Sequence, residues 1–293
     1  MDFDGALVTA LRDNGRLSVS ELARRLEVPR RRVQERIRDL LDSGAMRITA
    51  NVHPALLGIR TFCDVHVWVD GATAPVLDAL RGLREATLIS AVAGHCDVVV
   101  EVGAEDHHHL RELLARIRAI GGVRETANSQ LLQVFKSRFE AGSDLTETTF
   151  PMPDEIDTRI IALLREDGRM PYRRLGQEVG LSIGAVRARL ARLTQSGMLR
   201  ITCELHLSDS LHRMQAGAGI RLRGENGHLI DTLRAMPSVG FGALAVGQFD
   251  LIVTISGSSL RALHTAVDEI RTLEGVGQLT TWVHLQVMRE SYE

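Results

Sequence analysis

The sequence predicts an α+β chain built from two copies of one plan, in which three helices and a strand precede a βαββαβ domain. Three observations support this fold class. Many residues of the first copy recur 153 positions later in the second, and Asp4, which recurs as Asp157, is the first such pair. Apolar residues at helical spacing open each copy, and alternating apolar residues typical of strands follow. Because the repeating unit has the length of a pair of small domains, it indicates a tandem duplication rather than a solenoid.

The repeat has no gap over residues 4–49, where fourteen of 46 aligned positions are identical. The register still holds downstream, where Gly94 and Asp97 fall on Gly247 and Asp250. We therefore expect the chain to do twice, about a pseudo-twofold axis, whatever one half does. The identical pairs are Asp4/Asp157, Leu11/Leu164, Arg12/Arg165, Gly15/Gly168, Arg16/Arg169, Leu22/Leu175, Val33/Val186, Arg36/Arg189, Leu40/Leu193, Ser43/Ser196, Gly44/Gly197, Arg47/Arg200, Ile48/Ile201 and Thr49/Thr202.

Composition places the chain among ordinary globular proteins, with 293 residues, 44% hydrophobic and 25% charged. No apolar run approaches the ~20 residues of a membrane helix, and the acidic N-terminus does not look like a secretory signal. We therefore expect a cytoplasmic protein with no membrane partner. Cys63, Cys96 and Cys203 stand alone in the sequence, which suggests neither a disulfide framework nor a zinc site. We predict no metal and no cofactor.

The distribution of charge, rather than the net charge of -2, indicates nucleic acid. Seven arginines and three acidic residues lie between Arg24 and Asp39. Four arginines and no acidic residue lie between Val186 and Arg200. Lys136 is the one lysine among 35 basic residues. Arginine suits phosphates and guanine edges better than lysine, because its planar fork donates two hydrogen bonds at once.

Each copy opens with the pattern of a winged helix-turn-helix, which is three short helices followed by a strand. Ser18 is predicted to cap the second helix, with Glu21 completing a capping box. Pro29 suits the first turn of the third helix, and Gly44 suits its end. In the first copy we predict helices at 4–13, 18–26 and 30–42 and a strand at 46–52. In the second copy we predict helices at 157–166, 171–179 and 183–195 and a strand at 198–205.

Downstream of each strand the order βαββαβ predicts a ferredoxin-like domain. The predicted elements are 61–69, 74–83, 87–93, 98–102, 106–120 and 124–136, then 217–223, 228–236, 240–246, 250–256, 259–273 and 276–288. The domain boundaries follow as 1–52 and 154–206 for the winged helix-turn-helix domains, 58–138 and 213–290 for the ferredoxin-like domains, and 139–153 for a polar linker.

This plan resembles the Lrp/AsnC family of leucine-responsive and feast/famine regulators. The family's opening helix and Asp-Gly-Arg look like residues 157–169, and its Leu-Ala-x-x-x-Gly-Leu-Ser segment looks like residues 175–182. Its glycine-x-aromatic-Asp turn looks like residues 247–250 and, less closely, 94–97. The resemblance covers nearly the whole chain, twice, whereas the usual family subunit holds one copy. It implies a DNA-binding transcriptional regulator rather than an enzyme, and a homo-oligomer.

The third helix of each winged domain is the predicted recognition helix, whose N-terminal residues reach base edges of double-stranded DNA. For Arg36 and Arg189, at matched positions, a phosphate contact and a structural salt bridge both remain open. The two helices differ, Pro-Arg-Arg-Arg at 29–32 against Ser-Ile-Gly-Ala at 182–185, so we expect an asymmetric DNA site; an alternative is that one domain is only structural. The predicted DNA-binding residues are Ser18, Arg30, Arg31, Arg32, Gln34, Arg36, Arg38, Ser182, Gly184, Ala185, Arg187, Arg189 and Arg192.

The two Gly-x-x-Asp segments fall between the second and third strands of each ferredoxin-like domain. Glycine there permits a positive-φ turn, so a plain hairpin turn is as good an interpretation as a ligand contact. The resemblance favours a small-molecule effector, an amino acid or a related metabolite. His95 and Gln248 stand where the family often has an acidic residue. The predicted effector-binding residues are Gly94, His95, Asp97, Gly247, Gln248 and Asp250.

Two further interpretations concern assembly and chemistry. We expect the two ferredoxin-like domains to pair sheet to sheet, which makes the chain a built-in pseudo-dimer. The tract 107–109 is three consecutive histidines on one helix, whose side chains point around the axis and cannot easily share a metal. Siroheme decarboxylases have the same plan, but residues 91–97 and 245–250 lack their His-Asn-Tyr pattern. Because the plan is shared, a siroheme decarboxylase-like enzyme is nevertheless the alternative function.

Overall fold

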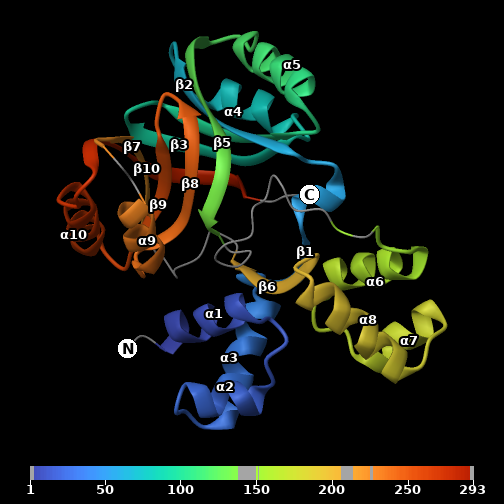
Figure 1. The fold of residues 1–293 in the computed structure, drawn as a ribbon. Helices are drawn as coiled ribbons and strands as arrows, with labels where there is room; N and C mark the ends of the chain where they lie inside the picture. The colour runs from blue at the N-terminus through green and yellow to red at the C-terminus, as the bar shows by residue number, and fades with distance from the viewer. Residues whose placement is uncertain (1–2, 138–149, 151, 206–213, 225–226, 291–293) are drawn as a thin grey trace. The chain divides into compact units, whose positions relative to one another are not determined.

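The computed structural model describes residues 3–137, 150, 152–205, 214–224 and 227–290. The chain divides into two compact units, each containing one part of either copy (Figure 1). The head unit comprises Met1–Leu56 and Phe150–His212, and the barrel unit comprises Leu57–Thr149 and Arg213–Glu293. Apart from residues 150, 152 and 153, the predicted linker 139–153 lies outside the described residues. No described helix is long and apolar enough to cross a membrane.

The head unit contains two three-helix domains, as the sequence predicts. Head 1 consists of α1 (Phe3–Asp13), α2 (Val19–Arg25), α3 (Arg30–Asp42) and β1 (Met46–Val52), followed by a single 3-10 turn, η1 (Pro54–Leu57). Head 2 consists of α6 (Glu155–Glu166), α7 (Tyr172–Val179), α8 (Ile183–Gln195) and β6 (Leu199–Leu205). The predicted capping box of Ser18 and Glu21 is present at the start of α2.

The strand of each head pairs with the strand of the other head, so the predicted wings form one two-stranded antiparallel sheet. Met46 pairs with Leu205 and Val52 pairs with Leu199. Strand β1 packs against α6 of head 2, and β6 packs against α1 of head 1. Apolar side chains of both heads consequently lie in one continuous core. The two heads therefore form one folded body with a shared core.

A reciprocal set of hydrogen bonds, the latch, joins the heads. The N–H of Gly15 donates to the carbonyl of Ile201 (2.8 Å), and the N–H of Gly168 donates to the carbonyl of Ile48 (2.9 Å). A Cβ on Gly168 would lie 2.9 Å from that carbonyl oxygen, so a side chain there would force the backbones apart. The Thr49 hydroxyl donates to the carbonyl of Arg165 (2.8 Å). Its counterpart, the Thr202 hydroxyl, donates to the carbonyl of Arg12 (2.9 Å).

The barrel unit contains the predicted two βαββαβ sets. The first set is β2 (Thr61–Val69), α4 (Ala74–Arg81), β3 (Ala86–Gly94), β4 (Val98–Ala104), α5 (His107–Arg118) and β5 (Val123–Lys136). The second set is β7 (Met214–Leu222), α9 (Gly227–Ala235), β8 (Val239–Gly247), β9 (Leu251–Gly257), α10 (Leu260–Arg271) and β10 (Val276–Glu290). Helices α4 and α5 bury one apolar cluster against the first sheet, and α9 and α10 bury another against the second.

The two sheets join edge to edge, which corrects the expected sheet-to-sheet pairing. The last strand of each copy hydrogen-bonds to the second strand of the other, β5 to β8 and β10 to β3. All eight strands close into a barrel in the order β10-β3-β4-β2-β5-β8-β9-β7. Both joined strands carry bulges, which let a long strand bend around the barrel. Closure removes the unpaired edges that two separate sheets would expose, and it encloses a shared interior.

Candidate nucleic-acid interface and effector site

The recognition helices α3 and α8 bury one face and leave their N-terminal outer face open. In α3 the buried residues are Val33, Ile37 and Leu40. The equivalent stripe of α8 is Val186, Leu190 and Leu193. Among the predicted contact residues, Ala185 is half-buried. Arg38 is exposed further along α3, and the exposed ones at or near the start of the two helices are Arg30, Arg31, Arg32, Gln34, Ser182, Gly184 and Arg187. Both heads therefore present side chains at the end of the helix that a groove would receive.

The matched residues Arg36 and Arg189 form structural salt bridges. The Arg36 guanidinium donates to both carboxylate oxygens of Asp4, at 2.9 and 2.7 Å. Arg189 donates to Asp154 (2.6 Å) and Asp157 (2.9 Å), and these bonds raise the pKa of its guanidinium. Each pair ties the first helix of a head to its recognition helix. Of the two interpretations left open for these arginines, the salt bridge is the one present in the structure.

Three other predicted DNA-binding residues also have partners within their own head. Arg192 bonds to Asp157, whose side chain is 1% exposed. The Ser18 hydroxyl accepts from the N–H of Glu21 (3.2 Å), and the Ser182 hydroxyl accepts from the N–H of Ala185 (3.2 Å). Both serines are therefore helix caps. Ser182 caps the recognition helix itself.

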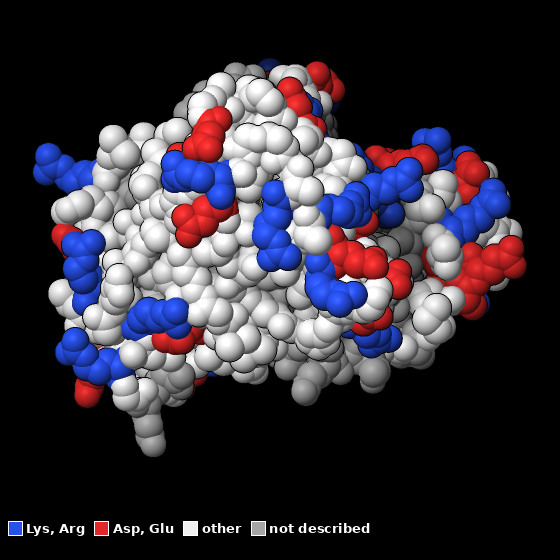
Figure 2. All heavy atoms as spheres, turned by 90° about the horizontal axis from the view of Figure 1, so that it is seen from above, with Lys and Arg blue, Asp and Glu red and all other residues white. Residues whose placement is uncertain are grey.

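On the one face of the molecule that Figure 2 shows, lysine and arginine side chains are interspersed with aspartate and glutamate side chains. Even on α3, Arg31 pairs with Glu35 one turn along the helix (2.7 Å). Individual exposed arginines of α3 and α8 are therefore the candidate contacts with nucleic acid.

In the barrel unit, the predicted effector glycines hold the two copies together. Gly94 and Gly247 have φ angles of 124° and 135°, which favour glycine. Each packs against the backbone of the other copy, and a Cβ on Gly94 would lie 2.9 Å from the carbonyl oxygen of Thr281. The N–H of Gln248 also donates to the carbonyl of Asn128 (3.0 Å). The turn therefore has a structural reason for its glycine.

The aspartates of the two segments fix a neighbouring strand. The Asp97 carboxylate accepts from the N–H of Val69, and the Asp250 carboxylate accepts from the N–H of Leu222, both at 2.8 Å. The Arg221 guanidinium donates to Asp250 as well (3.1 Å). The two carboxylates thus accept matched backbone hydrogen bonds, and Asp250 has an arginine partner in addition.

The remaining two predicted effector residues, His95 and Gln248, meet at the barrel's pseudo-twofold axis. Their side-chain Nε2 atoms lie 2.7 Å apart. Burial, together with the charge of His66, lowers the pKa of His95 and so favours its neutral form. A neutral imidazole nitrogen can accept the amide N–H of Gln248. The structure therefore brings one pair of the six predicted residues together, and it is an unlike pair.

The barrel interior also holds a polar pair that the sequence analysis missed. His66 is 1% exposed, and its Nε2 lies 3.0 Å from a carboxylate oxygen of the buried Asp64. The ring of Trp282 stands edge-on to that of His66, with centroids 4.4 Å apart. In β2 both polar residues alternate with Cys63, Val65 and Val67, which face the helices. Polar residues at every second position of a buried strand were the signal for them.

The second copy has no equivalent polar pair, because the matched positions are glycines. Gly217 stands at the position of Asp64, and Gly219 stands at that of His66. The indole of Trp282 and the ring of Phe249 lie directly on these glycines, in the space that a Cβ would need. The interior is therefore polar on one side and aromatic on the other, in the part of the barrel that the structure describes.

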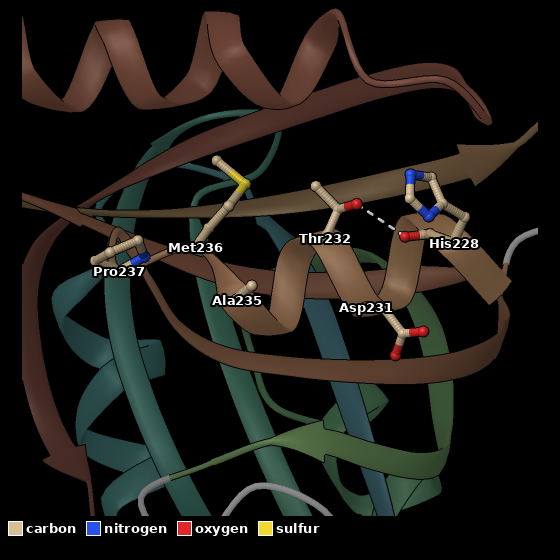
Figure 3. A pocket seen from close by; sticks show the side chains of 6 residues that line it. All are labelled: His228, Asp231, Thr232, Ala235, Met236 and Pro237. Atoms are coloured by element: carbon tan, nitrogen blue, oxygen red, sulfur yellow. Dashed lines mark hydrogen bonds between the residues drawn. The ribbon is translucent and has the colours of Figure 1, made fainter.

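Two other features carry no site. A shallow hollow beside α9 is lined by His228, Asp231, Thr232, Ala235, Met236 and Pro237, none of them a predicted effector residue (Figure 3). The histidine tract contacts three separate side chains, with His107 near Gln130, His108 near Glu112 and His109 near Glu85. Within the described residues, no group of three histidine, cysteine or acidic side chains is placed to hold a metal ion.

Comparisons with known proteins place these features in one family. A family model for the AsnC-type helix-turn-helix domain matches residues 2–41 and 154–194. A model for the Lrp/AsnC ligand-binding domain matches residues 62–141. An uncharacterized HTH-type transcriptional regulator of Pyrococcus abyssi is 27% identical over 143 residues, 48% of this chain and 97% of that protein. The HTH-type transcriptional regulator LysM of Saccharolobus solfataricus is 26% identical over 127 residues, 42% of this chain and 87% of that protein.

A solved structure shares the tandem architecture. The siroheme decarboxylase NirDL aligns over 99% of this chain and 93% of its own, with a TM-score of 0.65 and 13% identity. That likeness concerns the fold alone. The sequence relatives each match about half of this chain, in agreement with a duplicated unit. With both helix-turn-helix segments and the first ligand-binding domain matched, the chain is a member of the Lrp/AsnC family.

Proposed function

We propose that this protein is a sequence-specific DNA-binding transcriptional regulator whose one chain acts as a pseudo-dimer. The observation that carries the proposal is the head unit, in which a shared sheet and core hold two recognition helices with open N-terminal faces. DNA-binding proteins with two helix-turn-helix domains use such a pair of helices to contact two half-sites on one face of DNA. Here the pairing lies within the chain and needs no second subunit.

The two heads read different sequences in this proposal. Head 1 offers Arg30, Arg31 and Arg32, where head 2 offers Ile183, Gly184 and Ala185. A homodimer reads a palindrome because its halves are identical. Unlike halves on one rigid body favour an asymmetric site, with more phosphate and guanine contacts on the side of head 1.

A small molecule, an amino acid or a related metabolite, modulates the protein at the barrel unit. Support comes from the match to a ligand-binding domain and from the meeting of His95 and Gln248 at the axis. Chains associate further into a homo-oligomer, and the protein works in the cytoplasm. The effector acts by its differential affinity for two assemblies or head arrangements.

The experiment is fluorescence anisotropy of the full chain with DNA from upstream of its own coding sequence, across a salt series. We expect tight binding that falls steeply with salt, because phosphate contacts release counterions. Replacing Arg30, Arg31 and Arg32 by alanine is expected to weaken binding by about 100-fold, at roughly 1 kcal/mol for each charge-assisted contact. The matched control replaces Arg84, Arg111 and Arg118, exposed arginines of the barrel unit, by alanine. Equal weakening by both triple variants, or no binding in 50 mM salt, would contradict the proposal.

A second candidate is a siroheme decarboxylase-like enzyme, favoured by one observation. The barrel interior holds the buried histidine–carboxylate pair of His66 and Asp64, with His95 beside it, and such groups often serve proton transfer. The His-Asn-Tyr pattern of those enzymes is missing from residues 91–97. An absorbance titration with an iron-uroporphyrin tests this candidate. A saturable spectral shift abolished by His66→Leu would favour the enzyme over the regulator.

A further inference from the structure

An aromatic ring in head 2 lies between two arginines that come from different heads. The guanidinium of Arg16 lies 4.6 Å from the ring centroid of Tyr172, and that of Arg187 lies 5.1 Å from it. Arg16 belongs to the turn between α1 and α2 of head 1. Tyr172 is the first residue of α7, and Arg187 lies on the recognition helix α8. The ring therefore connects the latch between the heads to a recognition helix.

Backbone carbonyls, rather than carboxylates, accept the hydrogen bonds of the arginines at the axis. Arg16 donates to the carbonyls of Gly168 (2.8 Å) and Met170 (3.1 Å). Across the pseudo-twofold axis, Arg169 donates to the carbonyls of Gly15 and Leu17, both at 2.8 Å. Carbonyl oxygens orient a guanidinium without cancelling its charge.

Among the described residues, neither these two arginines nor Arg187 forms an ion pair with a carboxylate. Burial lowers the pKa of Arg169, and the nearby charge of Arg16 lowers it further, while the charge of Asp167 acts in the opposite direction. The positive charges of Arg16 and Arg169 therefore repel each other across the axis. A bound anion would relieve their repulsion.

The arrangement occurs on one side of the pair only. Arg16 and Arg169 are matched residues, but the counterpart of Tyr172 is Val19 and the counterpart of Arg187 is Gln34. Head 1 consequently lacks both the ring and the outer arginine. Head 1 has a different cation–π contact, in which the guanidinium of Arg32 on α3 lies 4.6 Å from the ring centroid of Phe3 on α1. The set of Arg169, Arg16 and Arg187 thus continues from the axis into head 2, and no matching arginine continues it into head 1.

We propose that Arg169, Arg16 and Arg187, with Tyr172 between the last two, form an arginine strip that binds the phosphodiester backbone of DNA between the two half-sites. The inference rests on the proposed function and adds a second contact surface to it. Arginine forks pair with phosphate oxygens in two parallel hydrogen bonds, and the carbonyl contacts preorganise two of the three forks. Tyr172 is a positioning residue, because cation–π contact fixes the directions in which Arg16 and Arg187 point.

The strip also accounts for how a weaker head is retained on DNA. The recognition helix of head 2 begins with isoleucine, glycine and alanine at positions where head 1 has arginines. Backbone contacts carry no sequence information but fix register and orientation on the duplex. A strip that leads to α8 would supply head 2 with the affinity that its helix N-terminus lacks.

The test compares full-chain variants by anisotropy with the upstream DNA across a salt series. Arg187→Gln, which installs the head 1 residue, is expected to reduce the slope of log affinity against log salt by about 0.9, the value for one lost phosphate contact. Tyr172→Leu is expected to weaken binding about two- to fivefold, as the loss of a cation–π contact implies. Tyr172→Phe keeps the ring and is the matched control, with unchanged binding and slope.

A second measurement separates a contact with phosphate from a structural effect. Neutral methylphosphonates replace the phosphates in the centre of the bound site. The wild type should lose affinity on this DNA, while Arg187→Gln should lose about threefold less, because its phosphate partner is already missing. Variant melting temperatures, followed by circular dichroism, report whether the heads still fold.

The outcomes distinguish the inference from the proposed function. Should the wild type bind DNA and depend on Arg30, Arg31 and Arg32, while Arg187→Gln and Tyr172→Leu keep its affinity and salt slope, the strip is wrong and the regulator stands. Equal losses on methylphosphonate DNA for wild type and Arg187→Gln would also overturn the strip. A wild type that binds no DNA refutes both.

Discussion

The two heads are alike where they hold each other and different where they face outward. Gly15 and Arg16 make the same cross-head contacts as Gly168 and Arg169, and all four belong to the identical pairs of the repeat. At the start of the recognition helices, three arginines stand against isoleucine, glycine and alanine. The residues that pair the two heads are therefore the same in both copies, whereas the residues proposed to contact DNA differ.

The barrel unit follows the same rule. Gly94 and Gly247 make equivalent backbone contacts across the axis. Behind them the interior differs, with Asp64 and His66 in the first copy against Gly217 and Gly219 in the second. A duplicated chain can thus keep equivalent backbone contacts between its copies while the outward-facing helix residues and the barrel interior differ.

The largest loss of stability is predicted for a substitution in the latch, where the two heads are alike. In Gly168→Ala the new Cβ would lie 2.9 Å from the Ile48 carbonyl oxygen, so two backbones must move apart. We expect a loss of about 2–3 kcal/mol in the free energy of unfolding of the head unit, typical of overpacking a tight contact. Circular dichroism at 222 nm during thermal denaturation measures it.

The control for the latch is Gly184→Ala on α8. Nothing but the Ser182 hydroxyl lies near its Cβ position, at 3.9 Å. Alanine favours helices over glycine by about 1 kcal/mol, so this variant should be as stable as the wild type or more stable. If Gly168→Ala melted at the wild-type temperature, the close approach of the heads would be refuted.

A smaller difference is expected between the matched aspartates Asp157 and Asp4. Asp157 is 1% exposed and bonded to Arg189 and Arg192, whereas the side chain of Asp4 is 25% exposed. Asp157→Asn should therefore destabilise the head unit by about 2 kcal/mol, since it leaves buried charge-assisted bonds unmade. Asp4→Asn should cost about 1 kcal/mol or less. Urea denaturation of both variants gives the two values, and a larger loss for Asp4→Asn would reverse the ranking.

The weakest effect concerns pH and the unlike interior of the barrel. Burial, with the charge of His66, lowers the pKa of His95, and burial also lowers the pKa of His284, against the opposing charges of Glu290 and Asp64. In the unfolded chain both histidines titrate near the ordinary value of about 6.5. The unfolded state therefore binds more protons as the pH falls below that value. Stability is full above it and decreases on further acidification.

Tryptophan fluorescence measures this dependence in the barrel unit alone. The chain has two tryptophans, Trp68 on β2 and Trp282 on β10. We expect the melting temperature followed by their emission to fall from pH 7.5 to pH 5.5, and to fall less in His284→Leu, which installs the residue of the first copy, Leu131. His228→Leu, at an exposed position, should change nothing. A melting temperature that rises on acidification would contradict the sign.

Local structure followed well from the sequence. Helical and alternating periods, with a cap such as Ser18, predicted the order and type of the elements in both copies, because amphipathic patterning and capping are local properties. The duplication itself indicated the pseudo-dimer. The comparisons confirm the helix-turn-helix segments of both copies and the family resemblance, and they match a ligand-binding domain at residues 62–141.

Contacts between the copies could not be predicted in the same way. A strand such as β1 shows alternation but not its partner, so its pairing with β6 stayed hidden. The closure of the barrel depends on which edges meet, which periodicity does not encode. Likewise, the sequence shows that Arg36 and Arg187 both lie on recognition helices, but not that Asp4 holds one and Tyr172 the other.

The central claim is that one chain presents two unlike heads as a single reader. Selection of binding sites from random DNA by the purified full chain, with native mass spectrometry of the selected complexes, tests it most directly. We predict an asymmetric consensus with two unlike half-sites at one fixed spacing, with each site occupied by the two heads of one chain of the homo-oligomer. A perfect palindrome bound by a single chain would contradict the account.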